Sequence, residues 1–78
     1  MLVIFSNEIE YQKWLIENAE YFTVIRFRDR CYERQEHTSL QAAEASAKHM
    51  VNSEPEARFM IYAVVGNAST WVKNVTGE

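Results

Sequence analysis

The sequence predicts a single α+β domain over residues 1–78: a two-layer sandwich with a mostly antiparallel sheet of four or five strands and two helices on one face. Three observations predict it. A chain of 78 residues is too short to divide into two cores. Its apolar fraction of 47% is too high for a disordered chain. Segments with helix and strand periodicity alternate, which is typical of helices packed on a sheet.

The chain opens with an uninterrupted apolar run over residues 1–5, which predicts a short buried strand. Ser6 or Asn7 is expected to cap the helix that follows, because its first turn is acidic. At about 100° per residue, one broad face of this helix is apolar. That predicted buried face consists of Ile9, Tyr11, Leu15, Ile16 and Ala19. Trp14 falls nearly opposite to it.

Residues 21–37 allow two interpretations, a single long strand or a hairpin that turns near residues 28–30. The hairpin is favoured because the segment is about three times the usual strand length. Asp29 also suits a turn. Alternation along the first half places one set of side chains opposite the other. Thr23, Ile25 and Phe27 form one set, and Phe22, Val24, Arg26 and Arg28 form the other.

A second helix begins at Thr38-Ser39-Leu40-Gln41, which matches a capping box and precedes an alanine-rich segment. Its predicted buried stripe is Leu40, Ala43, Ala47, Met50 and Val51. Residues 52–55 end the helix, and residues 58–65 form a strongly apolar strand. Gly66-Asn67 then predicts a tight hairpin turn, after which residues 68–75 return as the last strand.

Several function classes are disfavoured by the composition. Cys31 is the only cysteine, which excludes a disulfide-bonded scaffold, and no apolar stretch is long enough for a signal peptide or a membrane span. We therefore expect a cytoplasmic protein that does not act on membranes. No glycine-rich loop is present, and the spacing of Cys31, His37 and His49 matches no common zinc pattern. We expect no cofactor, no metal and no enzymatic activity.

Charge is distributed unevenly although the net charge is only −3. Half of the eight basic residues fall in one nine-residue stretch: Arg26, Arg28, Arg30 and Arg34. The first helix is acidic, and its Glu10 and Glu17 lie beside Trp14 on the helical wheel. If Trp14 is exposed, this arrangement suits docking on an arginine-rich protein groove. The alternative is that Trp14 is buried.

The last two strands predict a surface of aromatic side chains. Register from the Gly66-Asn67 turn places Tyr62 opposite Trp71, and Met60 opposite Lys73, on the sheet face that the helices leave open. The strand over residues 21–28 can place Arg26 and Arg28 on that face too. The candidate partner-binding residues are therefore Trp14, Glu10, Glu17, Arg26, Arg28, Arg30, Arg34, Tyr62 and Trp71.

Three interpretations of this surface are open. The aromatic pair can simply stabilise the sheet, with arginines solvating it. The surface can bind a protein, since Tyr, Trp and Arg are enriched at interface hot spots. It can also bind single-stranded nucleic acid by stacking and charge neutralisation. The net charge of −3 and the presence of only three lysines favour a protein partner over nucleic acid. A second copy of the chain is a further candidate partner.

The layout resembles small phage-encoded host-inhibitor proteins, including anti-CRISPR proteins and polymerase inhibitors. The resemblance depends on the chain length, on the strand that leads into Thr38-Ser39-Leu40-Gln41-Ala42-Ala43, and on the strand pair that follows the helix. These features cover about half of the chain and carry no functional residues over. The resemblance implies a non-enzymatic regulator or inhibitor that binds a host nucleoprotein complex stoichiometrically.

Overall fold

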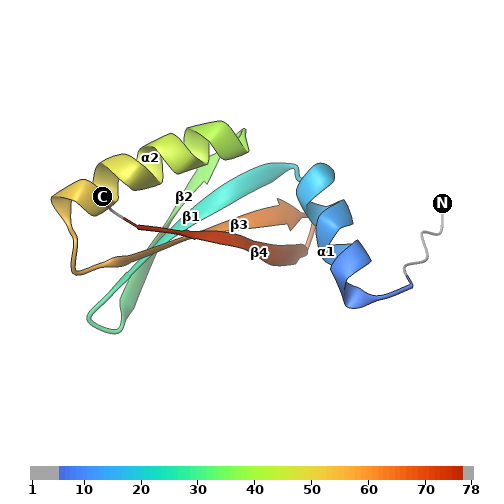
Figure 1. The fold of residues 1–78 in the computed structure, drawn as a ribbon, viewed down its shortest axis with the longest axis horizontal. Helices are drawn as coiled ribbons and strands as arrows, with labels where there is room; N and C mark the ends of the chain where they lie inside the picture. The colour runs from blue at the N-terminus through green and yellow to red at the C-terminus, as the bar shows by residue number, and fades with distance from the viewer. Residues whose placement is uncertain (1–5, 77–78) are drawn as a thin grey trace.

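The computed structural model describes residues 6–76 and confirms the α+β fold with an antiparallel sheet (Figure 1). The elements are α1 (Glu8–Glu17), β1 (Tyr21–Arg28), β2 (Cys31–His37), α2 (Leu40–Ser53), β3 (Arg58–Val65) and β4 (Ala68–Val75). The four strands have the order β2-β1-β3-β4, and each neighbouring pair is antiparallel. The strand expected over residues 1–5 lies outside the described residues.

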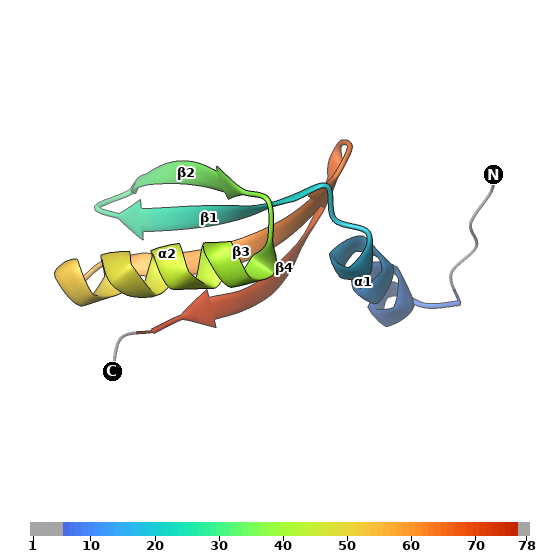
Figure 2. The same ribbon diagram turned by 90° about the horizontal axis from the view of Figure 1, so that it is seen from above.

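Helix α2 lies along one face of the sheet (Figures 1 and 2). Its N-cap is Ser39 rather than Thr38, and the Ser39 hydroxyl accepts a hydrogen bond from the Ala42 N–H at 3.1 Å. Ala43, Ala47 and Val51 are buried, in agreement with the predicted stripe. Because the alanine side chains are small, the helix backbone can approach the strands closely.

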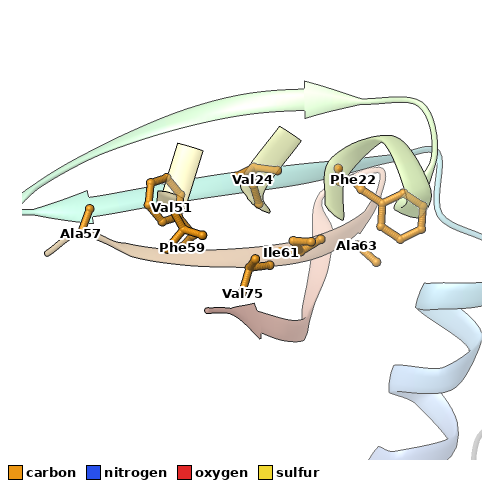
Figure 3. Packing of buried hydrophobic residues seen from close by; sticks show 10 residues of the cluster. Phe22, Val24, Val51, Ala57, Phe59, Ile61, Ala63 and Val75 are labelled. Atoms are coloured by element: carbon orange, nitrogen blue, oxygen red, sulfur yellow. The ribbon is translucent and has the colours of Figure 1, made fainter. Parts of the chain in front are cut away.

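The hydrophobic core lies between α2 and the two central strands, as Figure 3 shows. Phe59 and Ile61 of β3 and Val24 of β1 are among its largest fully buried side chains. Ile16 and Ala19, in and just after α1, pack against this same cluster. Both helices therefore contribute apolar side chains to one core on one side of the sheet.

Helix α1 packs against the sheet through its last turn, where Leu15 is only 2% exposed. The expectation that Ile9 and Tyr11 belong to its buried face is wrong, because they are 64% and 38% exposed. Figures 1 and 2 show the reason: α1 lies beyond one end of the sheet, near the β3–β4 turn, so its first turns extend past the strands. Periodicity identifies a helical face but not where the supporting sheet ends.

Two tight turns set the strand register. The segment over residues 21–37 is a hairpin, and Asp29 and Arg30 both take positive φ (53° and 66°), as a type I′ turn requires. Gly66 takes a φ of 58° at the first position of the β3–β4 turn, where a type II′ turn favours glycine. The Gly66 N–H also donates to the Glu20 carboxylate at 3.0 Å, which ties this turn to the α1–β1 connection.

Strand β4 contains one extra residue, which changes the predicted pairing. Tyr62 lies opposite Trp71 as predicted, but Lys73 lies opposite Ile61 rather than Met60. Val72 is the inserted residue, so the register shifts between Ile61 and Tyr62. The bulge moves Lys73 to the helix-covered face, where its ammonium pairs with Glu44 of α2.

Candidate interaction surface

The sheet face opposite the core displays side chains from all four strands, and we call it the open face. Its members follow from the register, because alternate residues of each strand point to the same side. The open face consists of Thr23, Ile25 and Phe27 of β1, Tyr32, Arg34 and Glu36 of β2, Arg58, Met60, Tyr62 and Val64 of β3, and Ser69, Trp71 and Asn74 of β4.

Large apolar and aromatic side chains remain accessible on the open face. Trp71 is 52% exposed, Tyr32 60% and Phe27 38%. The Trp71 indole N–H donates to the Asn74 side-chain oxygen at 2.9 Å, which holds the ring against β4. A depression of about 190 Å³ also lies on the open face, lined by Thr23, Ile25, Arg34, Tyr62, Val64 and Ser69. The surface can therefore offer both flat aromatic contacts and a small recess.

Arg34 and Arg58 supply the positive charge of the open face. Arg34 lies opposite Ile25, and Arg58 lies opposite Phe27. Each arginine therefore has an apolar residue as its cross-strand neighbour. Among the described residues, neither arginine takes part in an ion pair. Glu36 is the carboxylate on the same face. The sequence interpretation included Arg34 but missed Arg58, Tyr32 and Phe27.

Arg26 and Arg28 do not lie on the open face, which corrects the expectation for both residues. Their side chains follow Phe22 and Val24 on the helix-covered side, beyond the C-terminal end of α2. Arg26 donates to both oxygens of the Glu54 carboxylate, at 2.6 Å from Nη2 and 3.0 Å from Nε, and to Glu33 at 3.0 Å. Arg28 pairs with Glu54 at 3.3 Å.

Arg28 extends this cluster of ion pairs around Arg26 and Glu54, because it also pairs with Glu56 at 3.0 Å and with Asp29 at 3.4 Å. The hydrogen bond from Arg26 lowers the pKa of the Glu54 carboxyl below its ordinary value. The same hydrogen bond raises the pKa of Arg26. The cluster joins the β1–β2 hairpin to the end of α2, so these arginines have partners within the fold and a structural role.

The remaining candidate residues lie outside the open face. Arg30 is exposed in the β1–β2 turn, and Glu10 and Glu17 are exposed on α1. Trp14 is half-buried, between the exposed and the buried positions that the sequence left as alternatives. Of the predicted residues, Arg34, Tyr62 and Trp71 are the ones that lie together on the open face.

The side chains considered as metal ligands are scattered. Cys31 is exposed at the start of β2, His37 ends that strand, and His49 is exposed on α2. Within residues 6–76, no three potential metal-ligating side chains gather. No helix in that range has both the length and the apolar character needed to cross a bilayer.

The fold and this surface define a small α+β domain with one helix-covered sheet face and one aromatic, arginine-bearing open face. Comparison of the chain with protein-family models, with curated proteins and with solved structures finds no match.

Proposed function

We propose that the protein is a non-enzymatic, protein-binding regulator or inhibitor that uses its open face. One observation carries the proposal: exposed Trp71, Tyr32 and Phe27 share this face with two arginines that have no ion-pair partner among the described residues. Trp, Tyr and Arg are the residue types that most often dominate the energy of protein interfaces. Exposed aromatic side chains that share one face with arginines are typical of a surface that binds a partner.

The charges favour a protein over the alternative, a single-stranded nucleic acid. A strand of nucleic acid needs several cations along its backbone. On the sheet, Arg26, Arg28 and Lys73 are directed to the helix-covered side and are neutralised there by carboxylates. The open face retains Arg34 and Arg58, together with the opposing charge of Glu36. Two arginines can form hot-spot contacts with a protein, but they are too few to neutralise the phosphates along a nucleic-acid strand.

The class of target comes from the resemblance in layout to small phage-encoded inhibitors. Such a protein acts by occupying a surface of a host nucleoprotein complex in a stoichiometric manner. The proposed chemistry agrees with this role because it needs no cofactor and no reacting group. A bacterial lysate is therefore the first place to search for the target.

Capture from a nuclease-treated bacterial lysate tests the proposal. We expect immobilised protein to retain a partner after nuclease treatment, and Trp71→Ala or Arg34→Ala to reduce capture several-fold at an unchanged melting temperature. Lys48→Ala is the matched control, because it removes an exposed cation from α2. Loss of every partner on nuclease treatment would favour nucleic acid. If no partner is captured from either the nuclease-treated or the untreated lysate, the aromatic side chains have a purely stabilising role.

A further inference from the structure

We infer that β2 is a dimerisation edge, which pairs in antiparallel orientation with β2 of a second copy of this chain. The twofold axis passes between the two Gln35 residues, and the two four-stranded sheets join into one continuous sheet. The inference goes beyond the proposed function, because it uses the edge of the sheet and not its open face. It is carried by the exposure of β2, by the direction of its backbone groups and by the order of its charges.

Strand β2 is an accessible edge of the sheet. It comes first in the order β2-β1-β3-β4, and Figure 2 shows α2 lying over β3, so that the outer side of β2 is clear. Residues 32–36 are all exposed, and β2 pairs with β1 without a bulge. The opposite edge, β4, is interrupted by the bulge at Val72, and bulges discourage pairing with another strand. The regular edge is therefore β2.

The backbone of β2 presents hydrogen-bonding groups outward at alternate residues. Arg28 and Cys31 close a two-residue turn, so the N–H and C=O of Cys31 point toward β1. The same groups of Tyr32, Arg34 and Glu36 therefore point away from the sheet. An antiparallel partner must pair these outward residues with outward residues of its own. A twofold pair of β2 strands is consequently centred on a residue and not between two residues.

The charges of β2 select one of these registers. Arg34 and Glu36 are the two neighbours of Gln35, and Glu33 and His37 are the next residues along the strand. In a pair centred on Gln35, Arg34 lies opposite Glu36 of the second copy, and Glu33 lies opposite His37. Registers centred on Glu33, Arg34 or Glu36 set a charged side chain against its own copy, which is destabilising. The charge order is thus complementary to its own reverse, and this selects a second β2 as the partner.

Arg34 and Glu36 are available for this contact. Among the described residues, neither takes part in an ion pair. Their neighbours on β1 are Ile25 and Thr23, which are uncharged. In the dimer, two arginines and two glutamates alternate at the corners of a square, so each charge has opposite charges as its nearest neighbours. A second copy therefore supplies the partners that these two side chains lack.

The helix-covered side leaves room for the second strand. Arg26 of β1 donates to Glu33 at 3.0 Å, and Ser46 of α2 donates to Gln35 at 3.3 Å. Both acceptor side chains are thus held toward their own domain and away from the outer edge. Because the twofold axis is perpendicular to the sheet, the two α2 helices lie on one side and the two open faces on the other. The dimer therefore extends the open face without covering it.

Charge reversal within β2 tests the pairing. Because the paired edge is short, we expect a weak dimer that is dissociated at micromolar and assembled at millimolar concentration. Sedimentation equilibrium at the higher concentration should approach twice the monomer mass of 9.1 kDa. Arg34→Glu and Glu36→Arg should each stay monomeric, because each sets like charges opposite one another twice. The double variant with both changes should dimerise again, as should an equimolar mixture of the two single variants.

Further variants separate this contact from others. Arg58→Glu reverses the other arginine of the open face, on the interior strand β3, and should leave the dimer intact. Glu36→Pro removes an outward N–H that β1 does not use, so the fold should persist while the dimer is lost. Glu36→Gln keeps that N–H and should weaken the dimer several-fold. Thermal melts at micromolar concentration, where the chain is monomeric, establish that each variant is folded.

Four outcomes would overturn the inference. They are a wild-type chain that is monomeric at millimolar concentration, a dimer that survives both single reversals, a folded double variant that stays monomeric, and a dimer that is lost in Arg58→Glu. The last outcome would place the contact on the open face. All of these measurements use the purified chain without a target. The dimer and the proposed function can therefore fail separately.

Discussion

Arg26 and Glu54 form the most extensively hydrogen-bonded side-chain pair among the described residues. The guanidinium contacts both carboxylate oxygens, at distances of 2.6 to 3.1 Å, and the pair joins β1 to the end of α2. Both side chains remain partly accessible, with relative exposures of 25% and 31%. The pair therefore acts as a local clamp between elements and not as a deeply buried charge pair.

Acid should weaken this clamp in a defined pH range. The pKa of Glu54 is lowered from its ordinary value of 4.5 by the hydrogen bond from Arg26. The folded state therefore gains stability above pH 4.5, and this gain is lost as the pH falls through the lower pKa of the folded state. We expect the melting temperature of the wild-type chain to fall more steeply between pH 5 and pH 3 than that of Glu54→Gln. The variant should already be less stable at pH 7.

Parallel melting curves for the two proteins over this range measure the difference. Glu36→Gln is the matched control, because Glu36 is an exposed carboxylate of the open face. It should keep the wild-type pH dependence. An unchanged slope in Glu54→Gln would show that other carboxylates govern acid stability.

The β1–β2 hairpin is built on a turn in which one residue, Arg30, is unusual for the backbone geometry. Asp29 and Arg30 both occupy the left-handed region, where a side chain without a short polar group is disfavoured. The sequence indicated the turn through Asp29 but contains no glycine there. Pairing of the two strands over seven residue pairs therefore holds the turn in place.

Arg30→Gly should stabilise the domain because glycine adopts a φ of 66° without a steric cost. We expect a gain of about 0.5–1 kcal/mol in the free energy of unfolding. For a domain of this size that raises the melting temperature by about 2–8 °C. Arg30→Ala removes the same charge but keeps Cβ, so its melting temperature should not rise. Equal gains in both variants would assign the effect to charge instead of backbone geometry.

Local patterns were sufficient to predict the elements but not all of their faces. Capping residues, alternation and the Gly66 turn located both helices and the four described strands. Residues 21–28 contain two apolar sets, so alternation separates Val24 from Ile25 without showing which enters the core. The expectation that Arg26 faces the open side is wrong for this reason, because Arg26 shares its side with Val24, which enters the core. The bulge at Val72 has no local signature and depends on pairing with β3.

The two faces of the whole sheet differ in how their charges are satisfied. On the covered face, cations pair with carboxylates of α2 and of the segment that follows it. On the open face, Arg34 lies beside Ile25 and Arg58 beside Phe27, and neither has an ion-pair partner among the described residues. This division could not be predicted from the net charge of −3, because it depends on which alternate residues of each strand face the core. It supports the protein-binding role.

Salt should therefore weaken capture of a protein target by the open face without abolishing it. Raising the ionic strength from about 0.1 M to about 1 M shortens the Debye length from about 10 Å to about 3 Å. Contacts of Arg34 and Arg58 with carboxylates of the target then lose much of their attraction, whereas burial of Trp71 and Tyr32 is not screened. We expect the amount of target retained from a nuclease-treated lysate to fall several-fold over this range. Arg34→Gln with Arg58→Gln should retain less target at low salt and respond less to added salt. Complete loss of the target at high salt would contradict a contact anchored by the aromatic side chains, because apolar burial would then contribute little to it.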